Sequence, residues 1–192
     1  MTPPTDPSRA VQEILIAANL AHRTICTWQN DDLFISTHYD YLDNALRNIS
    51  DLIEKHHKNK AANLSYASQK ALQLPITSCQ VDHAWPLNRI LSVKQLPLTE
   101  QEIQKSIKYV VWCPLVLLTK EEHSEITNSD RHLKNEVNFN YPLRRLEGIQ
   151  IFKNNIDVSE QVHLYNWTLN DHVTYLSQRN MIFSKLAQQL SC

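Results

Sequence analysis

The sequence predicts an α+β fold in which helices predominate, and three observations support this class. The 192-residue chain contains a single glycine, Gly148, whereas folds built from tight hairpins use glycine in many of their turns. Apolar residues recur at helical spacing over long segments, beginning at Val11 and Ile14. Two shorter segments, residues 76–81 and 109–118, are instead rich in β-branched and aromatic side chains, which is typical of strands.

The N-terminal region predicts three helices. Ser8 is a preferred capping residue, so we expect a first helix from residue 9 to about residue 28. Residues 39–57 place their apolar side chains on one side of a second, amphipathic helix. Residues 61–72 are rich in alanine and predict a third helix, which ends before Pro75 because the residue preceding a proline avoids the helical conformation.

Two capping boxes mark helix starts in the middle of the chain. The motif Thr99-x-x-Glu102 predicts a short helix over residues 100–108, and Thr119-x-x-Glu122 predicts that another helix begins at Lys120. Between them, the second predicted strand is irregular at Pro114, because proline lacks the backbone N–H that a strand needs. With the short helix at 100–108 taken as an insertion, the predicted order from residue 76 onward is strand, strand, helix.

The C-terminal part predicts a polar loop over 128–140 and helices over 141–147 and 171–189. The chain length suits one compact domain. We expect three regions within it: an N-terminal helical region at residues 1–75, a strand–strand–helix region at 76–150 and a C-terminal helical region at 151–192.

The composition excludes several classes of function. A single glycine rules out a P-loop and a dinucleotide-binding fingerprint, which both need more glycines. The net charge of −1, from 19 Lys and Arg against 20 Asp and Glu, provides no global positive field for nucleic acid. Any DNA binding must therefore rely on a local group of basic residues.

The sequence also favours a cytoplasmic protein with no membrane partner. No apolar run is long enough to cross a bilayer, and the N-terminal MTPPTDPSRA lacks the features of a signal peptide. The cysteines include no C-x-x-C pair, so we expect reduced thiols and neither a cysteine zinc site nor a disulfide framework. These cysteines are Cys26, Cys79, Cys113 and Cys192.

Three polar residues beside the predicted strands could carry chemistry. Asp82 ends the first strand segment, and His123 lies in the first turn of the helix after the second. A carboxylate and an imidazole from separate elements suit a divalent cation that polarises a phosphodiester. His83 points to the opposite side of the chain from Asp82, and imidazole titrates near neutral pH, so His83 is a candidate general base.

Two segments around these residues resemble the motifs of HNH endonucleases. The string CQVDHAWPLNRIL is similar to the first motif of that family, in which an Asp-His pair precedes a loop proline. The string CPLVLLTKEEHSEI is similar to the last motif, a strand leading into a helix with a metal-binding histidine. A looser likeness continues into YPLRRLEGI, and the whole covers about a third of the chain.

The resemblance implies a ββα-metal fold and assigns a role to each residue of the site. Asp82 and His123 would be metal ligands, and His83 would be the general base. The cofactor would be one divalent ion, Mg²⁺ or Mn²⁺, with Zn²⁺ as an alternative. The family's central asparagine aligns with Pro114, and Asn88 or a backbone carbonyl is a candidate to replace it. The implied activity is phosphodiester hydrolysis in DNA, in a bacterial or phage restriction or defence setting.

Three basic residues are candidates for contact with the DNA backbone. They are Lys120 at a predicted helix start, where phosphate is attracted, and the neighbours Arg144 and Arg145. Adjacent residues on a helix point about 100° apart, so only one arginine would face a given site.

A second hypothesis is a non-catalytic helical interaction protein that carries a degenerate HNH-like element. Pro114 in place of the family's asparagine and the balanced net charge favour it. An Asp-His pair also occurs at residues 171–172, so the pair at 82–83 taken alone favours ordinary surface residues.

Overall fold

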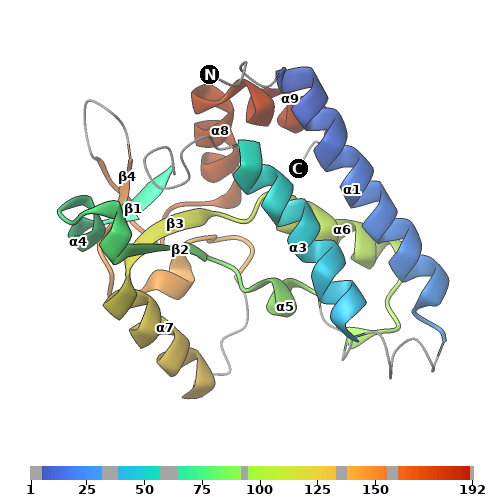
Figure 1. The fold of residues 1–192 in the computed structure, drawn as a ribbon, viewed down its shortest axis with the longest axis horizontal. Coiled ribbons are helices and arrows are strands. Elements are labelled where there is room, and N and C mark those ends of the chain that lie inside the picture. Colours follow the sequence, from blue (N-terminus) through green and yellow to red (C-terminus); the bar gives the residue numbers. More distant parts are fainter. Residues whose placement is uncertain are drawn as a thin grey trace. The chain divides into compact units, whose positions relative to one another are not determined.

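The structure is a computed structural model, and it describes residues 6–31, 39–56, 65–91, 95–132, 138–154 and 160–190. The predicted α+β class with helices predominating is confirmed. The chain divides into two compact units, each assembled from separate stretches of sequence (Figure 1). Unit 1 comprises Met1–His56, Pro86–Trp112 and Tyr175–Cys192, and unit 2 comprises His57–Trp85 and Cys113–Thr174.

Unit 1 is helical. Its helices are α1 (Pro7–Trp28), α3 (Tyr39–His56), α5 (Leu87–Ile90), α6 (Glu100–Val111) and α9 (Met181–Gln189). The long helix α1 packs against α3, α6 and α9. The apolar side of each helix faces this contact, and Ile14, Ile49 and Ile103 are fully buried there.

Unit 2 contains a five-stranded mixed sheet in the order β2-β3-β1-β4-β5. The strands are β1 (Tyr66–Ser68), β2 (Cys79–His83), β3 (Leu115–Thr119), β4 (Ile151–Lys153) and β5 (Glu160–Gln161). β1 and β3 are parallel, and the other neighbours are antiparallel. The unit also holds α4 (Gln69–Leu72) and α7 (Lys120–His132), while α8 (Leu169–Arg179) begins in it.

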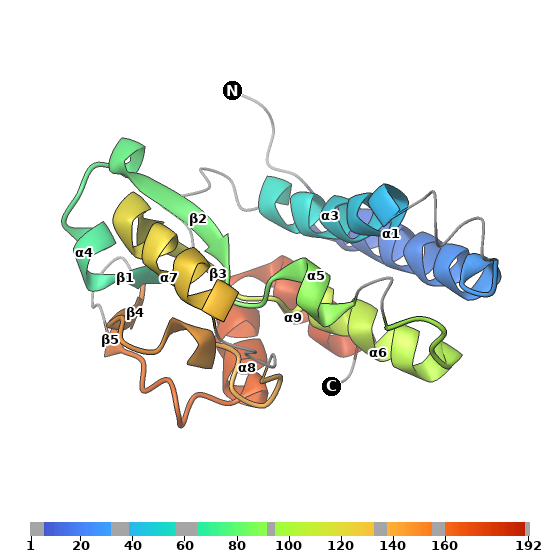
Figure 2. The same ribbon diagram turned by 90° about the horizontal axis from the view of Figure 1, so that it is seen from below.

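The arrangement of β2, β3 and α7 positions the candidate site. β2 pairs with β3 in a register that places Asp82 opposite Val116 and His83 opposite Leu115. All of β3 is buried, and α7 starts directly after it at Lys120. Figure 2 shows α7 lying along β2 and β3, which it contacts.

The first helix has a different capping residue from the predicted Ser8. α1 begins at Pro7, and the side chain of Asp6, not that of Ser8, accepts a backbone hydrogen bond at its start. Proline is favoured at a first helical position because its missing N–H would have no partner there. The second predicted helix, at 39–57, is confirmed as α3.

The third predicted helix, over 61–72, is wrong over most of its described part. Residues 61–64 lie outside the described residues, and β1 occupies Tyr66–Ser68 before the short α4. Tyr66 and Ala67 pair with strands on both sides of β1. This tertiary pairing outweighs the local helix propensity of the segment.

Both predicted strands are displaced toward the C-terminus. Ile76–Ser78 forms a 3₁₀-helix, and β2 runs instead over Cys79–His83. Within 109–118, the first three residues continue α6, because this buries Val110 and Val111. The strand β3 starts only after Pro114.

The C-terminal predictions also need correction. Helix α7 extends to His132 into the predicted loop, of which residues 133–137 lie outside the description. The predicted helix over 141–147 is only a 3₁₀ turn at Arg144–Leu146, and Gly148 follows it with a φ of 89° that favours glycine. The helix predicted over 171–189 is two helices, because Asn180 is extended and caps α9. The strands β4 and β5 were not predicted.

Candidate functional site

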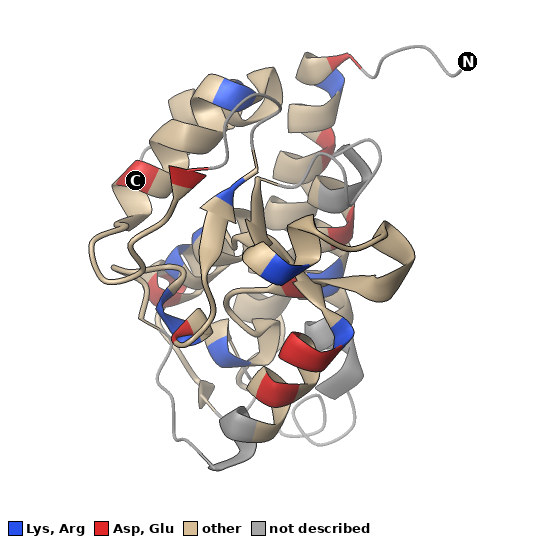
Figure 3. Ribbon diagram, turned by 90° about the vertical axis from the view of Figure 1, so that its left-hand side faces the viewer, with Lys and Arg blue, Asp and Glu red and all other residues tan. Residues whose placement is uncertain are grey.

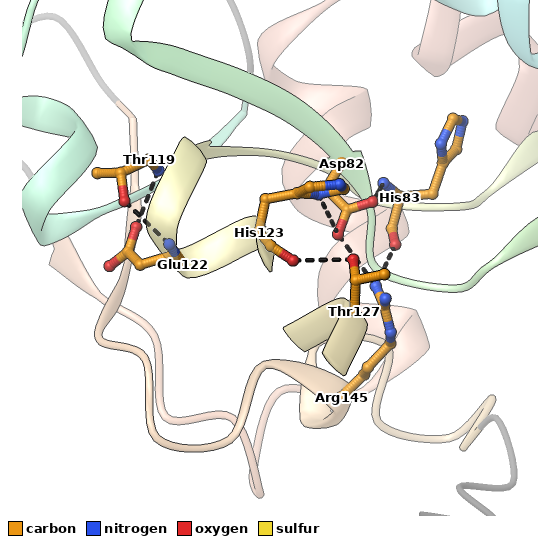
Figure 4. A network of polar contacts seen from close by, with 7 residues as sticks. All are labelled: Asp82, His83, Thr119, Glu122, His123, Thr127 and Arg145. Atoms are coloured by element: carbon orange, nitrogen blue, oxygen red, sulfur yellow. Dashed lines mark hydrogen bonds and ion pairs between the residues drawn. The ribbon is translucent and has the colours of Figure 1, made fainter. Parts of the chain in front are cut away.

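The structure brings two of the predicted site residues together within unit 2. Oδ2 of Asp82, in β2, lies 3.4 Å from Nδ1 of His123, in the first turn of α7. The two side chains are partly buried, with exposed fractions of 14% for Asp82 and 28% for His123. Figure 4 shows them facing each other from the strand and the helix.

The start of α7 is fixed by hydrogen bonds around Glu122. The capping box forms as predicted: Thr119 N–H donates to Glu122 Oε2, and Glu122 N–H donates to Thr119 Oγ1. The hydroxyl of Ser68, at the end of β1, also donates to Glu122 Oε2 at 2.5 Å. All three side chains are buried, so they anchor the first turn of α7 to the sheet next to His123.

Arg145 forms an ion pair with Asp82, and it binds the carboxylate oxygen that also lies nearest to His123. Its NH1 donates to Oδ2 of Asp82 at 3.1 Å and to the carbonyl oxygen of His83 at 2.9 Å. The side chain of Arg145 is only 13% exposed. Sequence reasoning assigned Arg145 to the DNA backbone and missed this ion pair. No sequence signal identifies it, because it depends on where the turn at Arg144–Leu146 packs.

The imidazole of His83 points away from the Asp82–His123 pair in Figure 4. This follows from the alternation of side chains along β2. The backbone of His83 is tied to the site on both sides: its N–H donates to Oδ1 of Asp82 at 2.9 Å, and its carbonyl accepts from Arg145. His83 as a whole is partly exposed.

The other two basic candidates lie on the surface of unit 2. Lys120 is the exposed first residue of α7. Arg144 is also exposed, and its guanidinium lies 5.5 Å from the centre of the Tyr165 ring. The hydroxyl of Tyr165 in turn donates to Glu147. Of the three basic candidates, Arg145 is the one that forms an ion pair with Asp82 in the described part of the chain.

Cys113 lies behind the site, where its thiol donates to the carbonyl oxygen of Trp85 at 3.3 Å. Burial raises the pKa of this thiol to about 12, and the nearby charge of Asp82 adds to the increase. The thiol is therefore protonated at neutral pH. Cys26 and Cys79 are free and partly buried, and Cys192 lies outside the described residues.

The donor geometry fits two ligands of one divalent ion. Ligands about 2.1 Å from the same ion, at tetrahedral or octahedral angles, lie about 3.0–3.4 Å from each other. The observed Asp82–His123 separation is 3.4 Å. His123 Nδ1 is buried and makes no hydrogen bond of normal geometry within the described parts of the chain. No cluster of three or more His, Cys, Asp or Glu suited to a metal occurs among those parts, so the pair would leave the remaining positions to water or substrate.

Charges are mixed over the described elements. Blue and red segments are interspersed in Figure 3, with acidic residues along α7 close to basic ones. Lys120 and Arg144 are exposed basic residues of unit 2. Within the residues that the structure describes, no helix is long and apolar enough to cross a membrane.

The comparisons with known proteins add no relative. No family model matches this chain, and neither a curated protein nor a solved structure is significantly similar to it. The case for a function therefore depends on the geometry of unit 2 and on the motifs in the sequence.

Proposed function

We propose that this chain is a metal-dependent endonuclease that hydrolyses phosphodiester bonds in DNA. Asp82 and His123 would hold one divalent ion, and a carboxylate with an imidazole suits Mn²⁺ or Mg²⁺, with Zn²⁺ as the alternative. The observation that carries the proposal is the 3.4 Å separation of Asp82 Oδ2 and His123 Nδ1 without a hydrogen bond between them.

Each residue has a defined task in this proposal. Asp82 and His123 bind the ion, which when bound supplies positive charge for the phosphate oxygens in the transition state. His83 would take a proton from the attacking water, because imidazole is a common general base and the residue is partly exposed. The buried contacts of Glu122 with Ser68 and Thr119 keep His123 at a fixed distance from β2.

The resemblance to HNH endonucleases supports the same assignment. It implies two strands followed by a metal-binding helix, and β2, β3 and α7 occur in that order along the chain, with α5 and α6 inserted between the antiparallel strands β2 and β3. The ββα-metal fold, DNA as the substrate and a restriction or defence setting remain predictions from this resemblance.

The direct test is the nicking of supercoiled plasmid DNA by the full-length protein with Mg²⁺ or Mn²⁺. His83→Ala should abolish nicking, while His163→Ala, which alters an exposed histidine of the same unit, should not. Circular dichroism spectra confirm that both variants fold. Equal activity of His83→Ala and the wild type would remove His83 from the mechanism, and an inactive wild type with both metals would contradict the proposal.

A non-catalytic interaction protein is the second candidate, and two specific observations favour it. Arg145 already forms an ion pair with Asp82, so this carboxylate has a counter-charge without a metal. The ring of His83 also points away from the pair. This candidate predicts that Mn²⁺ leaves the melting temperature of the protein unchanged, whereas a metal enzyme is stabilised by its ion.

A further inference from the structure

We infer that Arg145 and a divalent cation are alternative occupants of Asp82 Oδ2, so that cation binding releases the arginine to a phosphodiester anion. The inference rests on the proposed function and describes how the same site is regulated. Its basis is the position of one guanidinium nitrogen, NH1, 3.1 Å from the oxygen that faces His123.

Both oxygens of Asp82 are engaged. Oδ1 accepts the backbone N–H of His83 at 2.9 Å, and this bond is built into the turn at the end of β2. Oδ2 is the oxygen nearest to His123, and it is also the one that accepts from Arg145. A cation shared by Asp82 and His123 must therefore approach the oxygen that the arginine occupies.

Two cations cannot share this oxygen without strong repulsion. The side chains of Asp82 and Arg145 are 14% and 13% exposed, so water screens their charges poorly. A guanidinium is protonated at every accessible pH, so it cannot relieve the repulsion by losing a proton. A divalent ion at Oδ2 therefore weakens the attraction of this oxygen for Arg145, and the two cations compete for it.

The displaced arginine then needs a new anionic partner. A partly buried guanidinium that loses a carboxylate pays a desolvation cost unless another anion replaces it. A phosphodiester is the matching anion, because its oxygens accept two parallel hydrogen bonds from the planar fork of arginine. Binding of a metal ion would thus raise the affinity for a phosphodiester, and the reverse would also hold. In the free protein, the Arg145–Asp82 ion pair would lower the affinity for metal.

The test measures binding of Mn²⁺ alone to the full chain by isothermal titration calorimetry. Arg145→Gln should bind Mn²⁺ about fivefold or more tightly than the wild type, as expected for the loss of a competing ion pair. Arg144→Gln is the matched control, because it removes the same charge from an arginine that stacks on Tyr165. Asp82→Asn defines the baseline without the carboxylate.

The outcomes separate this inference from the proposed function. Equal Mn²⁺ affinities of Arg145→Gln and wild type, with Asp82→Asn much weaker, would overturn the competition and leave the metal site intact. Mn²⁺ binding no stronger in wild type and Arg145→Gln than in Asp82→Asn would overturn both. An equal gain in Arg144→Gln would show a general charge effect and also overturn the competition. If Arg145→Gln loses its folded circular dichroism spectrum, Arg145→Met replaces it, because methionine keeps an unbranched apolar stem without the positive charge, and the same direction is expected.

Discussion

Asp82 and His123 approach each other across β2 and α7, with 3.4 Å between Oδ2 and Nδ1, although α6 intervenes between them in the sequence. The pairing of β2 with β3 brings Asp82 beside Val116, and α7 begins as soon as β3 ends. The first turn of the helix therefore returns to the end of β2. Backbone pairing of β2 with β3 and the start of α7 directly after β3 set this relationship.

Asp82→Asn should remove stabilisation by metal. In the wild type, Mn²⁺ at 100 times its Kd should add about 2.7 kcal/mol to the free energy of unfolding, and the variant should gain none. Without metal the variant should lose about 2 kcal/mol, because the partly buried Arg145 loses its anionic partner. Thermal melts with and without Mn²⁺ measure both effects. Glu160→Gln, an exposed carboxylate in β5, is the control, and an equal Mn²⁺ shift in Asp82→Asn would exclude the site.

Ser68→Ala should destabilise the protein by about 2 kcal/mol. The hydroxyl of Ser68 donates to the buried Glu122 and accepts from Ala71 N–H at the start of α4, so one substitution removes two hydrogen bonds. Urea unfolding gives the free energy difference. The exposed Ser78 provides the control, for which Ser78→Ala should change stability by no more than about 0.5 kcal/mol. A cost as small as that of the control would mean that the Ser68–Glu122 bond contributes nothing to stability.

Short-range patterns predicted the parts of the fold that depend on neighbouring residues. The capping boxes at Thr99 and Thr119 gave the starts of α6 and α7, because their hydrogen bonds lie within four residues. The spacing of apolar residues gave α1 and α3 for the same reason. The sequence also predicted that Asp82, at a strand end, and His123, in the first turn of a later helix, converge, and the two side chains do come together.

The parts that were missed depend on contacts between distant segments. β4 has three residues and β5 has two, which is too short for an alternating pattern, and each exists through pairing with a neighbour. Val110 and Val111 favour a strand locally but are buried as the end of α6. The contact of Arg145 with Asp82 is of the same kind, because a distant turn brings the guanidinium to the strand.

Cys113 should resist labelling in the folded protein. Burial raises the pKa of its thiol to about 12, so the reactive thiolate is scarce throughout the range in which the protein is handled. Cys79 is partly exposed, and burial raises the pKa of its thiol as well, but the reagent can reach it. Maleimide treatment followed by peptide mass spectrometry should detect Cys79 before Cys113, and Cys113 only after addition of denaturant. Labelling of both cysteines at one rate in the native state would disprove the burial of Cys113.

Asp171 should contribute stability that disappears in acid. The hydroxyl and the backbone N–H of Thr168 both donate to its carboxylate, and these bonds hold the pKa of Asp171 below its ordinary value. A carboxyl with a lowered pKa in the folded state stabilises the protein above its unfolded pKa, which is about 4, and loses this contribution as the pH falls through the folded pKa. Asp171→Asn should therefore cost about 1 kcal/mol at neutral pH, as for the loss of a helix cap, and progressively less below about pH 4. Urea unfolding of both proteins across this pH range measures the difference, with Asp51→Asn on the exposed side of α3 as the control. A difference that persists undiminished in strong acid would mean that the ionised carboxylate is not the group that Thr168 stabilises.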